Sequence, residues 1–265
     1  MPTPPESRVL LTGATGGIGQ AIARQLLASG AKLLLQGRDA NALAALKQRL
    51  GHPNAVQTVA ADLCVAADRA RIADAARHFP GGINTVIHNA GWNQFGLFEE
   101  QSVHSIDYTV QLNLQAPMLL THELLPLLHL QRGAHLVFIT STFGRIGHPG
   151  YAAYAAAKFG LTGFAESLRR ELSDCDIAVT TLSPRATRTA LNPANVVALN
   201  AALKVQMDEP AVVASAVVDA LRTRPARRQL GWPEKLFVRI NAVFPRLVDR
   251  ALAKQLPLVK RYARS

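Results

Sequence analysis

A glycine-rich turn stands between the first apolar run of the chain and the helical pattern that follows it. Residues 8–11 read Arg-Val-Leu-Leu, which favours a short β-strand, and the helical pattern extends to about Ser29. The glycines at positions 13, 17 and 19 allow the backbone to turn tightly and to approach a ligand closely. A helix that begins at such a turn presents free N–H groups to a phosphate. A glycine-rich turn alone is only a weak signal of a dinucleotide site. Its position here, between the first strand and a helix, makes the prediction of such a site much stronger.

Short apolar runs alternate with helical patterns along the rest of the chain. We expect six strands, at residues 8–11, 32–36, 55–59, 83–87, 135–139 and 177–182. Helices are expected up to residue 29 and then at residues 41–50, 103–129 and 151–173, with Pro117 and Pro126 interrupting the third. Such alternation is typical of an α/β fold with a parallel sheet and helices on both faces. The 265 residues contain no internal repeat and no clear linker, which favours one domain.

The residues after the second strand indicate which nucleotide the site takes. An acidic residue there would accept a hydrogen bond from the ribose 2′-hydroxyl of NAD, but this chain has Gly37 and then Arg38. A guanidinium pairs well with a phosphate, so Arg38 favours NADP over NAD. The alternative is that Arg38 is an ordinary solvated charge. Asp39 is expected to cap the helix that follows.

The residues after the third and fourth strands belong to the same expected site. Asp62, which precedes Leu63, either bonds the adenine edge or is an ordinary turn acid. Asn89-Ala90-Gly91 follows the fourth strand, where small residues let a cofactor lie close.

Histidines offer no metal site in this sequence. The eight of them show no metal-ligand spacing. His88, directly after the fourth strand, is expected to be structural. His148 is expected to belong to the pocket or its lid.

Tyr154 and Lys158 lie four residues apart in an alanine-rich stretch that favours a helix. Positions four apart share one helix face, so the phenol and the ammonium can point into the same space. A nearby cation favours the phenolate, so we expect the pKa of Tyr154 to fall below its reference of about 10. A phenol whose pKa is lowered in this way can donate and accept a proton near neutral pH. Taken alone, the spacing favours an ordinary packing helix, and the other motifs reverse that preference.

In order and spacing, these motifs resemble those of the short-chain dehydrogenase/reductase family over about residues 8–220. The matching positions are the turn Thr12-Gly13-x-x-x-Gly17-Ile18-Gly19, the triplet Asn89-Ala90-Gly91, the helix asparagine Asn113, the serine Ser141 and the pair Tyr154-x-x-x-Lys158. His88 stands where the family more often has asparagine. The resemblance implies a Rossmann-like, doubly wound parallel sheet in a three-layer α/β/α domain.

The resemblance also implies hydride transfer between NADPH and a carbonyl or secondary alcohol, with NAD the less expected cofactor. Ser141 would donate a hydrogen bond to the substrate oxygen, and Tyr154 would exchange the proton. Lys158 would lower the pKa of Tyr154 and hold the nicotinamide ribose, and Asn113 would help to bind the water that connects Lys158 to solvent. The family's oligomers lead us to expect a homodimer or homotetramer built on the long helices. The cofactor site would comprise Thr12, Gly13, Gly17, Ile18, Gly19, Arg38, Asp62, Leu63, Asn89, Ala90, Gly91, Tyr154, Lys158, Pro184 and Thr189.

The loop after the sixth strand departs from the family pattern at one position. Pro184 and Thr189 keep the usual spacing, but Arg185 replaces the glycine that normally follows the proline. Residues 189–210, mostly small and apolar, would form a variable lid, which favours a hydrophobic ketone or an acyl chain as substrate. Arg185 and Arg188 could instead meet an anionic group.

A function of another class is also open, namely a non-catalytic NADP-binding sensor or scaffold. Such proteins often lose the tyrosine or the lysine of the catalytic pair. This chain keeps all four catalytic residue types, which favours the enzyme.

Positive charge is concentrated at the C-terminal end of the chain. Residues 1–221 carry 17 Lys and Arg against 16 Asp and Glu, whereas residues 222–265 carry 12 against 2. A nearly neutral body argues against nucleic acid as its partner. The N-terminus lacks a signal-peptide pattern, and there is no apolar run of about 18 residues, so we expect a cytoplasmic protein.

We expect a catalytic domain at residues 1–230 and a basic helical extension at residues 231–265. Pro233 suits a helix start, whereas Pro245 and Pro257 should kink or divide the extension. Either its apolar stripe packs on the domain or a sister subunit, which is the usual fate of such a stripe, or the helix lies on an anionic membrane surface. The apolar stripe consists of Leu236, Ile240, Phe244, Leu247 and Ala251. The basic stripe consists of Lys235, Arg239, Arg246, Arg250 and Lys254.

Overall fold

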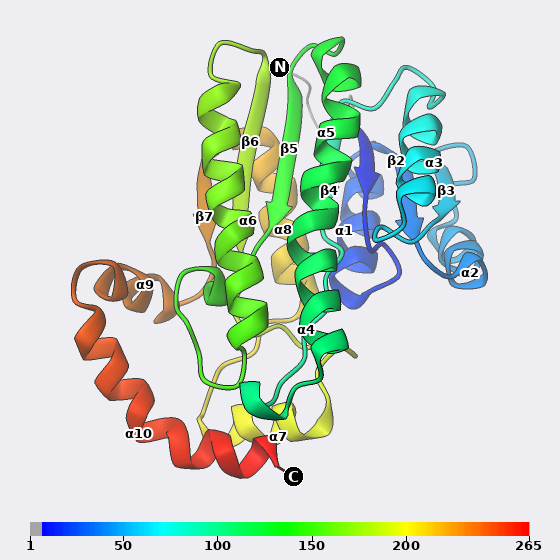
Figure 1. The fold of residues 1–265 in the computed structure, drawn as a ribbon. Helices are drawn as coiled ribbons and strands as arrows, with labels where there is room; N and C mark the ends of the chain where they lie inside the picture. Colours follow the sequence, from blue (N-terminus) through cyan, green and yellow to red (C-terminus); the bar gives the residue numbers. More distant parts are fainter. Residues whose placement is uncertain (1–6, 265) are drawn as a thin grey trace.

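Seven strands among residues 7–264, the part of the chain that this computed structural model describes, form one sheet. Their order is β3-β2-β1-β4-β5-β6-β7, and every neighbouring pair is parallel (Figure 1). The strands are β1 (Arg8–Leu11), β2 (Lys32–Gly37), β3 (Val56–Ala60), β4 (Thr85–His88), β5 (Ala134–Ile139), β6 (Ile177–Ser183) and β7 (Arg227–Gln229). Residues 1–6, where we expect no signal peptide, lie outside the described residues.

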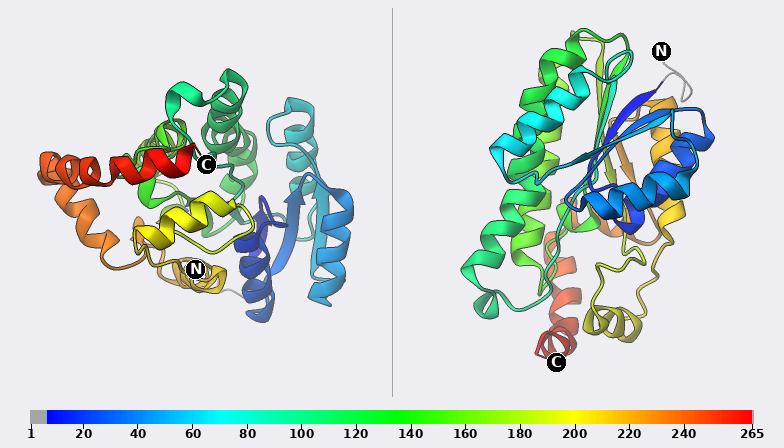
Figure 2. Two further views of the ribbon diagram at one scale, coloured as in Figure 1. Left: turned by 90° about the horizontal axis from the view of Figure 1, so that it is seen from below. Right: turned by 90° about the vertical axis from the view of Figure 1, so that its right-hand side faces the viewer.

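Helices cover both faces of the sheet, which is why its strands are apolar almost throughout (Figure 2). Successive residues of a strand serve opposite faces. Leu10 and Leu34 belong to one buried cluster, and Leu11 and Leu33 belong to the other. The first cluster is covered by α3 (Ala66–Arg77), α4 (Val103–Val110), α5 (Ala116–His129) and α6 (Ala152–Glu171). The second is covered by α1 (Gly17–Ala28), α2 (Ala40–Leu50) and α8 (Pro210–Thr223).

The strand order reverses direction at β1, which has β2 on one side and β4 on the other. The connections that leave these strands diverge at this point, so a crevice opens beyond their carboxyl ends. Doubly wound sheets bind their ligands in such a crevice. The three-layer α/β/α architecture expected from the sequence is confirmed, with this crevice at its centre.

The six expected strands are confirmed, with boundaries that differ from the expected ones by no more than a few residues. Four further strands and helices were not expected: the helices α3, α7 (Ala194–Ala202) and α8 and the edge strand β7. β7 is short and consists of the polar residues Arg-Arg-Gln, so it lacks the apolar pattern by which strands are found. It pairs with β6 and completes the sheet.

The helical stretch between residues 103 and 129 is interrupted in a different way from the one we expected. Between α4 and α5 the chain makes a π-helical turn, Gln111–Gln115. Pro117 lies in the first turn of α5, and Pro126 lies inside that helix without ending it. A π turn inserts one extra residue per turn and thereby changes which side chains face the interior. Here it faces Asn113 inward, where it is 1% exposed.

The C-terminal segment, residues 231–264, forms two helices, α9 (Glu234–Val243) and α10 (Pro245–Ala263). They lead away from β7, and α10 then returns beneath the sheet to contact α7 (Ala194–Ala202) (Figure 1). Val259 of α10 is fully buried, and the amide of Asn195 on α7 donates to the carbonyl of Tyr262 at 3.2 Å. Pro245 divides the segment as expected, whereas Pro257 lies within α10.

The expected apolar stripe of this segment does not form one buried face. The break at Phe244 and Pro245 changes the helical phase, so the residues before and after it do not continue a single stripe. Leu236, Phe244 and Leu247 are 44%, 60% and 55% exposed. The buried apolar residue in the first turns of α10 is Val248, which the stripe did not include.

Candidate active site

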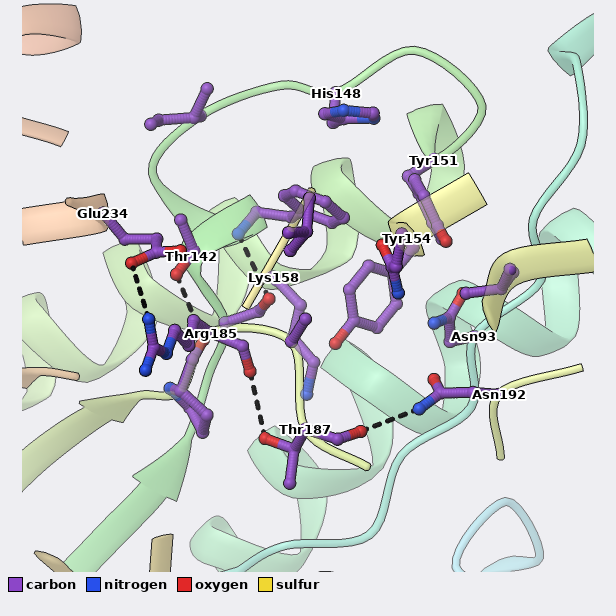
Figure 3. Close-up of a pocket in the computed structure, with 18 of the residues that line it drawn as sticks. Asn93, Thr142, His148, Tyr151, Tyr154, Lys158, Arg185, Thr187, Asn192 and Glu234 are labelled. Atoms are coloured by element: carbon purple, nitrogen blue, oxygen red, sulfur yellow. Dashed lines mark hydrogen bonds and ion pairs between the residues drawn. The ribbon is translucent and has the colours of Figure 1, made fainter. Parts of the chain in front are cut away.

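A cavity of about 760 Å³ opens at the carboxyl ends of the strands. Its inner end is formed by residues that follow β4, β5 and β6 and by the beginning of α6. Its outer part is bounded by α7 and by the C-terminal segment. Figure 3 shows that polar side chains gather at the inner end, among them Tyr154 and Lys158.

Tyr154 and Lys158 lie one turn apart near the start of α6 and both line the cavity, as their spacing predicts. Lys158 is only 4% exposed, and its Nζ donates to the carbonyl of Ile139 at the end of β5, at 3.1 Å. The same Nζ lies 5.7 Å from the centre of the Tyr154 ring. The two side chains are directed toward the same part of the cavity (Figure 3). The helix therefore brings a phenol and an amine together where a substrate can reach them.

The expected fall in the pKa of Tyr154 is wrong for the protein by itself. Burial raises the pKa of Tyr154 to about 12, and the nearby Ser141 hydroxyl lowers it by a smaller amount. Burial also lowers the pKa of Lys158 to about 8. Removal from water disfavours the charged form of both groups, and this cost exceeds the attraction that a cation at this distance offers to the phenolate.

Ser141 follows β5 and begins the 3₁₀ turn Thr142–Gly144. Its Oγ accepts a hydrogen bond from the N–H of Phe143 at 3.1 Å, which leaves the hydroxyl proton to be donated elsewhere. The next residue is held from the edge strand, because Gln229 of β7 donates to Oγ1 of Thr142 at 2.9 Å. The unexpected strand β7 therefore supports the loop that carries Ser141.

Asn113 is held inside the π turn by the backbone of the loop after β4. Its Nδ2 donates to the carbonyls of Trp92 at 2.7 Å and Thr109 at 2.9 Å, and its Oδ1 accepts from the N–H of Trp92 at 3.3 Å. Such turns are frequent at functional sites. A methyl group on Gly91 would come within 2.9 Å of Asn113 Oδ1, so the glycine permits this approach.

The glycine-rich turn is fastened to the loop after β4. Oγ1 of Thr12 accepts from the N–H groups of Asn89 at 3.0 Å and Ala90 at 3.1 Å, and Nδ2 of Asn89 donates to the carbonyls of Thr12 and Gly13. Gly13 has a φ of +63°, and a Cβ there would lie 2.7 Å from the Cα of Ala90. The two loops therefore touch only because position 13 has no side chain.

The start of α1 is open to an anionic ligand. Its N-cap residue is Gly16, which supplies no side-chain acceptor to the first N–H groups. Gly17 lies beside Thr189, and Ile18, Pro184 and Thr189 line the cavity. Free N–H groups at a helix start, reached through a surface without side chains, fit the diphosphate of a dinucleotide.

Arg38 stands at the end of β2 with its guanidinium exposed, and Nη1 donates to the hydroxyl of Tyr108 at 2.7 Å. Asp39 caps α2 as expected, because Oδ1 accepts from the N–H groups of Asn41 and Ala42. Oδ1 of Asp62 accepts from the N–H of Cys64 at 2.9 Å, which is the turn role that we left open. Leu63 is buried in the core, so only its backbone can face a ligand.

The two singled-out histidines have the roles expected of them. His88 is buried, stacks on Phe138 and shares a hydrogen bond of 2.9 Å with Thr121, and burial lowers its pKa to about 3. His148 lines the cavity, where its ring stacks on Phe143. Across residues 7–264, no group of three or more His, Cys, Asp and Glu side chains is placed to share a metal ion.

The guanidinium of Arg185 is already paired with carboxylates of this chain, which corrects the expectation that it could bind an anionic group of the substrate. Its guanidinium pairs with Asp208 at 2.6 Å and lies 3.6 Å from Glu234, and it donates to the carbonyl of Trp232 at 3.0 Å. The side chain is 9% exposed. We call this set of contacts the Arg185 latch, because it joins the loop after β6 to the start of the C-terminal segment. Arg188 is exposed and pairs with Glu209.

Sequence reasoning placed residues 189–210 over the pocket, but it missed the lining that the C-terminal segment supplies and one polar residue at the inner end. Asn93 lines the cavity, and its Oδ1 is buried with no hydrogen-bond partner among the described residues. Its position two residues after the Asn89-Ala90-Gly91 triplet was the available signal. The missed part of the outer lining comes from α9 and α10, and no local pattern could have placed α10 beside α7.

Comparison with known proteins assigns this site to a family. A model of the short chain dehydrogenase family matches residues 7–198. This chain belongs to the short-chain dehydrogenase/reductase family. The bovine dehydrogenase/reductase SDR family member 7B is 35% identical, over 93% of this chain and 80% of its own. An uncharacterized oxidoreductase of Mycobacterium tuberculosis is 31% identical, over 93% of this chain and 97% of its own.

Solved structures share the fold of this chain. A short-chain dehydrogenase/reductase of Burkholderia phymatum in complex with NAD matches with a TM-score of 0.82 and 23% identity, over 91% of this chain and 95% of its own. That identity supports the fold alone. The family membership makes this chain an oxidoreductase that acts on CH–OH groups and uses a nicotinamide nucleotide. None of the helices in residues 7–264 combines the length and the apolar character that crossing a bilayer demands.

Proposed function

We propose that this short-chain dehydrogenase/reductase is an NADPH-dependent reductase of hydrophobic ketones, including 3-oxoacyl-like compounds. The observation that carries the proposal is the pair Tyr154 and Lys158 at the polar inner end of a cavity whose outer walls are mostly apolar. An apolar cavity with a few converging polar groups suits a substrate with one reactive carbonyl on a hydrocarbon body.

The roles that we propose follow from what each group can do. The nicotinamide, when bound, supplies the hydride. Ser141 donates a hydrogen bond to the substrate oxygen. Tyr154, which burial keeps protonated, gives its proton to that oxygen as the carbonyl group is reduced to the alcohol. Lys158 holds the nicotinamide ribose and, when charged, stabilises the tyrosinate that remains. Asn113 holds the water through which the pair regains a proton.

NADPH is the proposed cofactor because of Arg38. Its guanidinium is exposed at the end of β2, where the adenosine ribose of a dinucleotide lies in doubly wound folds. A 2′-phosphate would offer a charged partner stronger than the neutral hydroxyl of Tyr108 that Arg38 contacts here. Because the Burkholderia structure contains NAD, NADH is the cofactor to compare with NADPH in binding and activity measurements.

A panel of straight-chain and cyclic ketones, assayed by the loss of NADPH absorbance, tests the proposed function. Turnover of hydrophobic ketones, with weak or no turnover of polar ones, is the expected result. Tight NADPH binding without turnover of any carbonyl compound would favour the sensor or scaffold instead. A matched panel of secondary alcohols with NADP⁺ reports the reverse direction, which we expect to be the weaker one in a cytoplasmic enzyme.

We also infer a homo-oligomer built on α5 and α6. Met118 and Leu119 on α5 and Phe159 on α6 are each 38% exposed or more, on helices whose other faces cover the sheet. Exposed apolar side chains on adjoining long helices suit an interface between two copies of one chain. Sedimentation of the purified protein would give the molecular mass, and Phe159→Glu is expected to shift it toward the monomer.

A peripheral contact with anionic membranes is a second proposal for the C-terminal segment. Trp232, Val243 and Phe244 are each more than half exposed. The basic residues Lys235, Arg239, Arg246 and Arg250 lie between them or shortly after them in the sequence. Exposed aromatic side chains beside positive charge suit a headgroup layer. The chain should therefore pellet with anionic liposomes at low salt, and Phe244→Glu should release it. Val103→Glu, an exposed apolar residue outside the segment, is the control. Failure to pellet, or release by both variants, would favour a sister subunit as the partner.

A further inference from the structure

The outer part of the cavity is built from two walls that are far apart in the sequence. One wall is α7 with the loop after it, from which Val196, Leu199 and Leu203 line the cavity. The other is the C-terminal segment, from which Phe237 and Ile240 of α9 and Leu247, Val248, Ala251 and Leu252 of α10 line it. Both walls are mostly apolar along this stretch, with Asn200, Lys204 and Gln255 among their polar lining residues, whereas the catalytic end carries Ser141, Tyr154 and Lys158.

The wall on α10 is elongated. Its cavity-lining residues extend from Leu247 to Gln255, which corresponds to about 12 Å along a helix. Two apolar surfaces with one reactive end between them fit a narrow hydrocarbon chain better than a compact ring system, because a chain can lie along the helix and contact both walls.

Contacts at both ends hold this wall in place. At its beginning, the Arg185 latch fixes Trp232 and Glu234. At its far end, Val259 is buried, Asn195 of α7 bonds the backbone of Tyr262, and Arg264 pairs with Glu100 at 2.9 Å. A wall anchored on both sides can set a substrate length, which a freely moving tail could not.

We propose that α9 and α10 form the specificity wall of this enzyme, and that its substrates carry an unbranched apolar chain that lies along α10 against α7. The carbonyl at the head of the chain stands at Ser141 and Tyr154. This inference rests on the proposed reductase function and adds the substrate class and the residues that select it. The half-exposed side chains of Phe237 and Leu247 form the rim of the wall and are covered when the chain is bound.

Two alanines of α10 give a matched test. Ala251 and Ala253 are both exposed residues of the same helix, but only Ala251 lines the cavity. Ala251→Phe places a ring between the walls, whereas Ala253→Phe places the same ring outside the cavity. Both substitutions are at exposed positions, so neither is expected to prevent folding.

The experiment measures kcat/KM with NADPH for a series of straight-chain 2-alkanones. In the unaltered protein each added methylene should raise kcat/KM about fourfold until the walls are filled, as expected for one buried CH₂. Ala251→Phe should abolish the rise of kcat/KM with chain length, and Ala253→Phe should keep the whole rise. A flat profile in the unaltered protein, or equal effects of the two variants, would overturn the wall while leaving the reductase intact.

A binding measurement keeps the inference testable without turnover. Calorimetry with 2-dodecanone needs no chemical step, and Ala251→Phe should weaken its binding at least tenfold while Ala253→Phe does not. Binding that is the same in both variants would overturn the wall. Loss of ketone reduction together with normal 2-dodecanone binding would instead overturn the proposed function.

Discussion

The sheet body, residues 7–230, and the C-terminal segment, residues 231–264, are held by different kinds of contact. In the body, strands and helices bury two large apolar clusters, and the apolar surface that is thereby removed from water stabilises the fold. In the C-terminal segment, Val248 and Val259 are the buried residues among those that the structure describes. The remaining attachments of the segment are polar, and the Arg185 latch is the most enclosed of them.

This difference suggests a division of roles between the two regions. The proposed catalytic residues are all in the body, where many contacts hold each one, whereas the segment contributes only lining to the cavity. A region held by few contacts can differ between relatives without disturbing a region held by many. Chemistry and substrate selection should therefore respond to different substitutions, and the following predictions test that separation.

The largest effect is expected at the chemical step, in the body. Tyr154→Phe removes the proposed proton donor, so kcat should fall by roughly 10² to 10⁴, the range for losing a general acid. NADPH binding should survive, because the ring is kept. Tyr151→Phe is the control, since this neighbouring tyrosine also lines the cavity and loses the same atom. Equal losses in the two variants would remove the proposed role from Tyr154.

The next effect concerns the attachment of the segment. Arg185→Ala leaves the enclosed carboxylates of Asp208 and Glu234 without their cation, at a cost of roughly 3 kcal/mol. We expect proteolysis to start within residues 232–264 while the body stays protected. Arg188→Ala, which breaks an ion pair with both side chains more than 60% exposed, should cost less than about 1 kcal/mol. Uniform cleavage of body and segment in the Arg185 variant would contradict their separate attachment.

Cofactor choice should depend on the body alone. Arg38→Ala should weaken NADPH binding by roughly 1–3 kcal/mol through loss of a charge-assisted bond, with little change for NADH. Arg185→Ala should leave the ratio of the two affinities unaltered. Fluorescence titration with both nucleotides measures this ratio. A preference of the unaltered protein for NADH would refute the role of Arg38.

The smallest effect is a pH dependence that belongs to the body. Burial lowers the pKa of Lys158 to about 8 and raises that of Tyr154 to about 12. Below pH 8 both groups carry the proton that reduction requires, and as the pH rises through 8 only Lys158 loses it. The kcat/KM for NADPH should then fall by up to about tenfold per pH unit. The fall should disappear in Lys158→Arg, whose guanidinium stays charged, and its persistence there would exclude Lys158 as the cause.

Much of the body could be predicted because its signals are local. The apolar runs that became β1 to β6 and the glycines at positions 13, 17 and 19 each specify a conformation through their own neighbours. Tyr154 and Lys158 share a helix face because of their spacing alone. By contrast, α3 was missed because its alanines and charged residues make only a weak apolar pattern, although Ile72 and Ala76 are buried in the core.

The sequence by itself determined the family, the parallel sheet and the order of the motifs, because periodicity and spacing are properties of neighbouring residues. Only the tertiary structure decided the protonation of Tyr154, since burial by the whole fold outweighs one cation. It also decided the partners of Arg185, which lie more than 20 residues away at Asp208 and Glu234. The place of α10 beside α7 was settled in the same way, because contacts between distant segments depend on how the complete chain closes.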